Sequence, residues 1–578
     1  MLFLLYINDL TVALPPRTSN TLHADDLAEW TSAEHTTTAT YIMQNTVNNV
    51  SNWAKENCME INCSKTQATL FSLSTTKENT SLKLNEEKIP QVDNPKFLGV
   101  TLDTRLTWKP HLEATAAKST RKLSLLKKLA GTTWGADGKI LNRVYTGAVR
   151  PIMEYATTSW ATASNTNKAK LDRVQNIALR AITGGMKTTP IKEMQKRADI
   201  EPLENRRELK VLTQTEKLRR LPSHPMHKKL SAMTKNRLKR KSLNHLTKDL
   251  RKKESEILDQ EIKEESHLSI KNWNQTSETY TIELEVPGLY SREEQHPAQE
   301  KSTTLEMLNE KYPSDVWTHI YTDGSADDAV KNGGSGVFIK TTDGQKHTFS
   351  NATGKRCSNF KAETLALQTA ISHIITTQPE KSVILSDSKA ALQSLSSDSP
   401  DRDVQKIKED LHSIPPRCTV VLQWIPAHCG ISGNEEADQL AKNGSKMIQP
   451  NSTTTYREAK TLLKNKRKTE WRRSTDNYNP KQDPINNLKR NDQTAIFRLR
   501  TGHCSLRSHL KRIGVSPSAL CDCGAEQTVH HILQDCPKLE AQRRRSWAQE
   551  VPTSTKLYGT ANDLRCTVQV LAACRVRV

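Results

Sequence analysis

Four acidic residues are spaced along the chain so that their carboxylates could serve one reaction: Asp323, Glu363, Asp387 and Asp438. Singly, an Asp before a glycine or at the end of a strand is more often a turn or capping residue. Gathered together, four like charges need cations, and Mg²⁺ prefers ligand sets made only of oxygen. Two Mg²⁺ ions about 3.5–4 Å apart, or Mn²⁺ in their place, would activate a water and stabilise the leaving oxygen in phosphodiester hydrolysis.

Strand ends and helix starts would bring these acids together. The strand-like runs THIYTD, SGVFIK, SVILSD and TVVLQWIP are interrupted by the helical run NFKAETLALQTAISHII. Glu363 would lie in the first turns of a helix capped by Ser358 or Asn359, and Asp438 on a helix capped by Asn434. This order of elements predicts a mixed α/β domain.

Four segments, IYTDGS, SNFKAETLAL, ILSDSKAAL and WIPAHCGISGNEEADQLA, resemble the ordered motifs of the ribonuclease H family. The resemblance implies a mixed five-stranded sheet with helices over residues 314–447, in which the four acids are catalytic Mg²⁺ ligands. It also implies that His428 assists proton movement or product release and that Asn359 contacts the nucleic acid. Phe360 departs from the Asn that the family often has at this position.

A second acidic motif, HADDLAEW, contains the adjacent pair Asp25 and Asp26. With LFLLYINDL before it and NCSKTQATLFS and KFLGVTLD after it, the motif resembles the downstream palm motifs of reverse transcriptases from non-LTR (jockey-like) retrotransposons. The resemblance implies Asp25 and Asp26 as remnant metal ligands and Lys65 as the basic residue of the next motif, while His23 replaces the usual Tyr or Phe. The family's first catalytic Asp and its Gly-rich motif would precede Met1. We therefore expect a 5′-truncated protein that cannot polymerise alone.

A cysteine–histidine cluster lies in LCDCGAEQTVHHILQDCPKL. Cys521, Cys523, His531 and Cys536 form a set of three thiols and one imidazole, which suits one structural Zn²⁺ ion. His530 is the competing ligand, and incidental reduced cysteines are the alternative to a metal site. Non-LTR element proteins often carry such a zinc knuckle after the ribonuclease domain, and the basic flanks KRKTEWRR and QRRR suit a grip on single strands.

The chain has 578 residues and a formal charge of +21, which favours a polyanion as partner. We expect a multidomain α/β and α+β protein with five parts: a partial palm (1–111), a helical thumb-like region (112–205), a charged helical linker (206–313), the ribonuclease H domain (314–447) and a basic helical region (448–578) with the knuckle at 521–536. The apolar start MLFLLYINDL lacks the features of a signal peptide, and the sequence has no apolar run long enough for a membrane span.

The combined prediction is an endoribonuclease that cuts the RNA strand of RNA–DNA hybrids by two-metal-ion catalysis. Its expected partners are hybrids and other nucleic acid, with an association with an intact element polymerase as a further expectation, and neither a membrane nor a small-molecule cofactor is expected. We expect an intracellular, non-secreted protein in the nucleus or cytoplasm. The stretch KNRLKRK at 235–241 is either a nuclear signal or a solvated helix face. The alternative function is an inactive nucleic-acid-binding relic or accessory protein.

Overall fold

The protein is described by a computed structural model that covers residues 2–11, 14–74, 78–131, 134–232, 242–258, 280–289, 296–328, 330–397, 399, 401–451, 453–547 and 549–578. The basic stretch at 235–241 lies outside these residues. The chain divides into two compact units, one made of Met1–Arg207 with Thr475–Val578 and the other of Glu208–Ser474. Among the described residues, no helix has the length and apolar character needed to cross a membrane.

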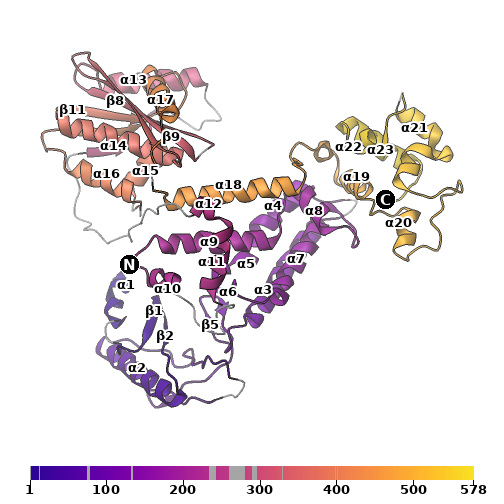
Figure 1. Ribbon diagram of the computed structural model, residues 1–578, viewed down its shortest axis with the longest axis horizontal. Coiled ribbons are helices and arrows are strands. Elements are labelled where there is room, and N and C mark those ends of the chain that lie inside the picture. Colours follow the sequence, from indigo (N-terminus) through magenta and orange to yellow (C-terminus); the bar gives the residue numbers. More distant parts are fainter. Residues whose placement is uncertain are drawn as a thin grey trace. The chain divides into compact units, whose positions relative to one another are not determined.

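The second unit contains a six-stranded mixed sheet (Figure 1). Its strand order is β10-β9-β8-β11-β12-β7, with antiparallel pairing from β10 to β8 and parallel pairing from β8 to β7. The strands are β7 (Tyr280–Glu283), β8 (Thr318–Asp327), β9 (Lys331–Lys340), β10 (Lys346–Gly354), β11 (Lys381–Ser386) and β12 (Thr419–Trp424).

Helices cover both faces of this sheet because its strands alternate apolar residues between two cores. One core joins Ile320, Ile384 and Leu422 to the helices on one face, and the other joins Tyr321, Val383 and Leu385 to those on the other face. The first face carries α14 (Asn359–Thr377), α15 (Lys389–Ser396) and α16 (Arg402–His412), and the second carries α13 (Pro297–Lys311) and α17 (Ser432–Lys446).

The sixth strand corrects the expectation of a five-stranded sheet preceded by a linker with little core. Strand β7 pairs in parallel with β12, and the ring of Tyr280 meets the ring of His412 edge to face with 5.5 Å between centres. Helix α13 buries Met307 and Leu308 against the sheet. The apolar residues of TYTIELEV alternate as in a half-buried strand. The many charged residues around this segment favoured the prediction of a charged linker instead.

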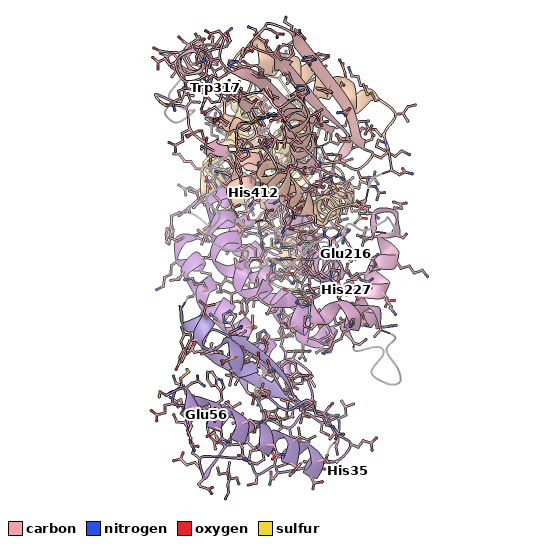
Figure 2. All side chains as sticks on the ribbon, turned by 90° about the vertical axis from the view of Figure 1, so that its left-hand side faces the viewer. His35, Glu56, Glu216, His227, Trp317 and His412 are labelled. Atoms are coloured by element: carbon pink, nitrogen blue, oxygen red, sulfur yellow. The ribbon has the colours of Figure 1, made fainter. Side chains whose placement is uncertain are left out.

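The remaining helices of this unit are α9 (Leu203–Arg219), most of which lies in it, α10 (Pro225–Ser231), α11 (Leu243–Lys253), α12 (Ser255–Leu258) and α18 (Tyr456–Ser474). Buried charges join some of them. Glu216, on α9 and labelled in Figure 2, is buried and forms ion pairs with Arg220 and Arg251.

The first unit is mainly helical and begins with a small α+β region. That region contains α1 (Leu2–Tyr6), a short 3₁₀ turn (Asn8–Thr11), the hairpin of β1 (Ser19–His23) and β2 (Asp26–Trp30), the long helix α2 (Thr36–Glu56) and two short hairpins, β3–β4 (Lys83–Leu84, Glu87–Lys88) and β5–β6 (Lys96–Phe97, Val100–Thr101). The helices α3 (Lys109–Leu129), α4 (Gly138–Val144), α5 (Arg150–Glu154), α6 (Thr157–Trp160), α7 (Asn165–Thr183) and α8 (Ile191–Ala198) follow, with a π-helical turn at Tyr145–Val149.

One hydrophobic core joins these helices to the C-terminal part of the chain. Leu123, Leu179 and Met194 lie in the same cluster as Ile496 and Leu564. The C-terminal elements are α19 (Arg490–Thr501), α20 (Arg507–Arg512), α21 (Glu540–Ser546), α22 (Thr553–Tyr558) and α23 (Ala561–Ala573), with short helical turns at Pro484–Asn487, His531–Asp535 and Pro537–Leu539. Residues 475–578 therefore pack with the helices of 109–198 rather than forming a core of their own.

Candidate metal centres and the ribonuclease H site

Three of the four predicted acids meet where β11 ends, beside Asp323 in the middle of β8 rather than at the expected strand end. One carboxylate oxygen each of Asp323, Glu363 and Asp387 lies within 4.8 Å of the others. The parallel register explains this meeting, because Thr322 of β8 pairs with Ser386 of β11 and the next residue on each strand is an acid. The side chains of Asp323 and Glu363 are buried, and that of Asp387 is half-buried.

Glu363 is brought to the strands by the start of α14. Ser358 is the N-cap of this helix and accepts a hydrogen bond from the Lys361 N–H at 3.3 Å, so the cap is Ser358 and not Asn359. A Cβ at Gly324, the residue after Asp323, would lie 2.2 Å from the Glu363 amide nitrogen. Only glycine therefore allows the first turn of α14 to approach β8 this closely.

Asp438 reaches the same place from α17, on the other face of the sheet. Two glycines of β9 permit the close packing of this helix, because a Cβ at Gly334 or Gly336 would lie 2.1 or 2.0 Å from a carbonyl oxygen of α17. The Asp438 carboxylate pairs with Lys442 one turn along the helix. It also contributes to the raised pKa of Asp323, so the fourth acid belongs to the group, which we call the carboxylate cluster.

The acids of this cluster disfavour one another's charge. Burial, followed by the neighbouring Asp387 and Asp438, raises the pKa of Asp323 to about 8. Burial, then Asp323 and Asp387, raises the pKa of Glu363 well above its usual value. Among the described residues, the buried Oε2 of Glu363 has no hydrogen-bond partner. A buried carboxylate oxygen without a donor, inside a group of like charges, is the arrangement that a bound cation would stabilise.

Asn434 has a different place from the expected one. The helix begins at Ser432 with Ile431 as its N-cap, so Asn434 lies inside the first turn and does not cap it. Its Nδ2 donates to Asp387 Oδ2 at 3.3 Å, and the same contact lowers the pKa of Asp387 against the larger raising effect of burial. Asn434 was predicted as the cap because Asn is common at that position, but the helix begins three residues earlier than this prediction implies.

His428 lies in the loop between β12 and α17, with its backbone in the left-handed region (φ 55°). It lines a small cleft together with Asn434, Glu435 and Asp438. After burial, which raises it, and the Asn434 hydrogen bond, which lowers it, the nearby His428 also lowers the pKa of Asp387. Asn359 is exposed as the first residue of α14, and the partly buried ring of Phe360 follows it.

The predicted zinc ligands also meet. Cys521, Cys523, His531 and Cys536 each offer one atom within 4.8 Å of the others, and we call them the thiol–imidazole set. The Sγ atoms of Cys521 and Cys523 each lie 3.9 Å from Sγ of Cys536. A tetrahedron with Zn–S bonds of 2.3 Å has edges of about 3.8 Å, so the thiol spacing fits that ion. His530 points elsewhere, with Nδ1 3.0 Å from Thr553 Oγ1.

The third predicted group is a hairpin tip in the first unit. His23 pairs with Asp26 across the β1–β2 hairpin, which leaves Ala24 and Asp25 as its turn. In the described part of the chain, neither Asp25 nor Asp26 belongs to a group of three potential metal ligands. Lys65 is exposed in a turn after α2, where its backbone N–H donates to Asn62 Oδ1 at 3.1 Å.

Comparison with known proteins supports the reading of the sheet domain. The RNase H family model matches residues 316–446. The probable RNA-directed DNA polymerases from transposon BS and from transposon X-element, both of Drosophila melanogaster, are 30% identical over 177 residues and 28% identical over 202 residues. These matches cover 30% and 32% of this chain and 20% of each relative, so the chain spans about a fifth of the length of these relatives.

Among solved structures, RNase H1 from the halophilic archaeon Halobacterium salinarum NRC-1 is 20% identical, and the match covers 22% of this chain and 96% of that chain with a TM-score of 0.20. The sequence prediction of ribonuclease H and reverse transcriptase relatives is confirmed by the family match and the transposon proteins. Residues 316–446 therefore match the RNase H family, in a chain that is similar over part of its length to the probable RNA-directed DNA polymerases of two Drosophila transposons.

Proposed function

We propose that the RNase H domain hydrolyses the RNA strand of RNA–DNA hybrids and that the carboxylate cluster holds the divalent cations for this reaction. The observation that carries the proposal is the meeting of Asp323, Glu363 and Asp387 within 4.8 Å inside a domain of the RNase H family. Binding alone gives no physical reason to bury like charges together, because each buried carboxylate without a cation costs stability.

The donor set fits Mg²⁺ or Mn²⁺, since it consists of carboxylates and leaves the buried Oε2 of Glu363 without a partner among the described residues. When bound, a pair of such ions activates a water and stabilises the leaving oxygen of a phosphodiester. Asp323, Glu363, Asp387 and Asp438 would hold the ions.

The surrounding residues of this chain position these ligands. Asn434 donates to Asp387 Oδ2, and the Trp424 Nε1–H donates to the Asp387 carbonyl at 3.2 Å, so both ends of this residue are fixed. His428 lies in the cleft beside the cluster, where its imidazole can accept or donate a proton as product leaves. Asn359 is exposed at the start of α14, a turn before Glu363, and would contact the hybrid.

A substrate panel tests this function. The full chain is incubated with one sequence as RNA–DNA hybrid, double-stranded RNA, double-stranded DNA and single-stranded RNA. We expect cleavage of the RNA strand of the hybrid alone, with 5′-phosphate and 3′-hydroxyl products, which stops with a chelator and returns with Mg²⁺ or Mn²⁺. Equal cleavage of single-stranded RNA, or cleavage in the chelator, would refute the proposal. Hybrid binding without cleavage would favour a nucleic-acid-binding accessory protein.

We propose a structural role for one Zn²⁺ ion in the thiol–imidazole set. Ile532 and Leu533, on the turn that begins at His531, belong to the core shared with the helices of 109–198. Two buried basic side chains also bind this turn. Lys556 Nζ donates to the Leu533 carbonyl at 2.7 Å, and Arg543 Nη1 donates to the Cys536 carbonyl at 2.8 Å. A metal held there would fix the C-terminal region in its packed conformation.

The hairpin with Asp25 and Asp26, followed by Lys65, is consistent with part of a polymerase palm, and we propose no reaction for it. We propose the boundaries at residues 111 and 205 for the organisation of the chain. The sheet domain extends beyond the expected boundaries at 313 and 447, because β7 and α13 pack on the sheet and Glu458 of α18 bonds to Ser358. An intact element polymerase stays a proposed partner.

A further inference from the structure

Helix α18 (Tyr456–Ser474) follows the RNase H family match and carries a row of positive charges along one face. Arg457, Lys460, Lys464 and Lys468 recur at spacings of three and four residues, which places them on the same side of the helix. Arg457, Lys464 and Lys468 are exposed and Lys460 is half-buried. We call these four residues the basic face of α18.

The opposite side of α18 is packed and neutralised. Ala459 and Leu463 are buried there, and Lys466 and Arg467 pair with Glu254 at 2.9 and 3.1 Å. None of the four residues of the basic face forms an ion pair with another residue that the structure describes. The helix therefore turns its paired charges inwards and leaves a run of unpaired charges outwards.

The start of α18 is fixed to the start of α14. Glu458 is fully buried, and its carboxylate accepts the Ser358 N–H at 3.2 Å and the Thr455 N–H at 2.9 Å, with Lys361 Nζ 3.9 Å away. The Arg457 guanidinium lies over the Phe360 ring, 4.1 Å from its centre. A buried carboxylate with these partners holds one end of the basic face beside Asn359 and Phe360.

This attachment places the basic face close to the carboxylate cluster. Asn359 precedes Glu363 by four residues on α14, or roughly 6 Å along the helix axis, and Arg457 to Lys468 spans roughly 16 Å along α18. A hybrid longer than a few base pairs must continue beyond the phosphate that is cut. Its backbone is a line of negative charges, which complements a straight row of cations that starts next to the site.

We propose that the basic face of α18 binds the phosphate backbone of the hybrid substrate, as an extension of the RNase H site that the family match does not include. Arg457, held on the Phe360 ring, supplies the phosphate contact nearest the cleavage site. Lys460, Lys464 and Lys468 continue the row of contacts along the helix. The substrate class in this inference rests on the proposed hybrid cleavage.

The test compares two pairs of charge-removing variants in the full chain. Lys464→Gln/Lys468→Gln removes two charges from the basic face while keeping long side chains with good helix propensity. The matched control is Lys340→Gln/Lys346→Gln. These two exposed lysines pair across β9 and β10, and Lys340 also pairs with His319, at the end of β8 away from Asp323.

The kinetics of cleavage of a hybrid of about 20 base pairs are measured against salt concentration. We expect the α18 pair to raise KM about tenfold or more at low salt, to leave kcat unchanged and to reduce the slope of log KM against log salt by about 2, one for each lost phosphate contact. The control pair should match the wild type. Equal effects of the two pairs, or an unchanged salt slope in the α18 pair, would overturn the proposal.

Failure of the proposed function gives a different result. If the wild type cuts no hybrid, the two pairs are compared in hybrid binding by fluorescence anisotropy. Selective weakening by the α18 pair would support the basic face as a nucleic-acid site without catalysis, and equal binding by both pairs would overturn it. An acidic protein segment as the occupant of α18 would leave every hybrid measurement at the wild-type value.

Discussion

The carboxylate cluster and the thiol–imidazole set are both four-residue groups suited to divalent cations, but they are assembled in opposite ways. The carboxylates come from the middle of one strand, the end of its neighbour and two helices on opposite faces of the sheet. The thiols and the imidazole come from residues 521–536 alone. The first group therefore depends on a completed fold, while the second can help to complete one.

The two groups also differ in how their surroundings shift the pKa values of the ligand side chains. Burial and neighbouring acids raise the pKa of Asp323 and of Glu363, so the fold of the RNase H domain holds the carboxylates together against their repulsion. In the thiol–imidazole set the shifts are mixed. The Ala525 backbone N–H lowers the pKa of the Cys523 thiol, whereas burial and the neighbouring cysteines raise the pKa of the Cys536 thiol to about 11. We propose that cations at the carboxylate cluster serve chemistry and that zinc at the thiol–imidazole set serves packing.

The largest effect expected from a change outside the carboxylate cluster tests how strictly the fold sets its geometry. Gly324→Ala would place a Cβ 2.2 Å from the Glu363 amide nitrogen and force α14 away from β8. A shift of about 1 Å in a catalytic group can cost on the order of 10²-fold, so hybrid cleavage should fall by at least that factor. Gly147→Ala is the control, because a Cβ there meets nothing within 4 Å. Wild-type cleavage by Gly324→Ala would contradict the close approach.

A smaller effect is expected where a neighbour only orients a ligand. Asn434→Ala removes the donor to Asp387 Oδ2 and should lower kcat by roughly 10–100-fold, as loss of such orienting partners does. The affinity for Mg²⁺ should fall as well, so that half-maximal cleavage needs a higher Mg²⁺ concentration. The control is Asn443→Ala on the same helix, where the side chain is exposed and only accepts from Gln439. Equal Mg²⁺ titrations of the two variants would contradict the orienting role.

The thiol–imidazole set should affect stability and leave the chemistry alone. Cys523→Ser should release zinc and lower the thermal midpoint of the first unit by roughly 6–12 °C for a loss of about 3 kcal/mol. Cleavage of the hybrid below that temperature should keep the wild-type kcat. Cys566→Ser on α23 is the matched control, as this thiol lies outside the set. Unchanged zinc content in Cys523→Ser would contradict the assignment.

The smallest effect separates the two neighbouring histidines. His530 is exposed and contacts Thr553 and Asp535, so His530→Ala should change the unfolding free energy by about 0.5 kcal/mol or less and retain zinc. His531→Ala should lose the metal, because Nε2 of His531 lies 3.1 Å from Sγ of Cys523. Zinc content by atomic absorption distinguishes the two variants. If His531→Ala keeps zinc and His530→Ala loses it, His530 is the ligand and the assignment of His531 is wrong.

The sequence was informative where function depends on short motifs. Residue type and spacing point to the four acids and the zinc ligands, and the resemblance to the ribonuclease H family points to His428; the structure brings each group together. The residues whose roles could not be predicted from the sequence are those whose roles depend on packing between distant segments. Nothing local indicates that Gly324, Gly334 and Gly336 allow close helix approaches, or that Asn434 orients Asp387 rather than capping a helix.

Larger features were missed for the same reason. The strand Tyr280–Glu283 has the right alternation but sits in a charged stretch that favoured a linker. The C-terminal residues read as a separate basic region, yet Ile496 and Leu564 share a core with Leu179, and no local pattern encodes a contact across that sequence distance. The sequence also predicted helix α18 as part of that region. Glu458 instead fixes α18 to α14, and both helices lie in the unit Glu208–Ser474.

The central claim is that the carboxylate cluster makes this domain a metal-dependent nuclease for hybrids, and one comparison tests it most directly. An end-labelled hybrid is incubated with Mg²⁺ and with the wild type, Asp387→Asn or Glu436→Gln, the last an exposed acid on α17 changed in the same way. We predict that Asp387→Asn cleaves on the order of 10³-fold more slowly, since metal stabilisation is worth several kcal/mol, while Glu436→Gln cleaves at the wild-type rate. Equal cleavage by Asp387→Asn and the wild type would contradict the account.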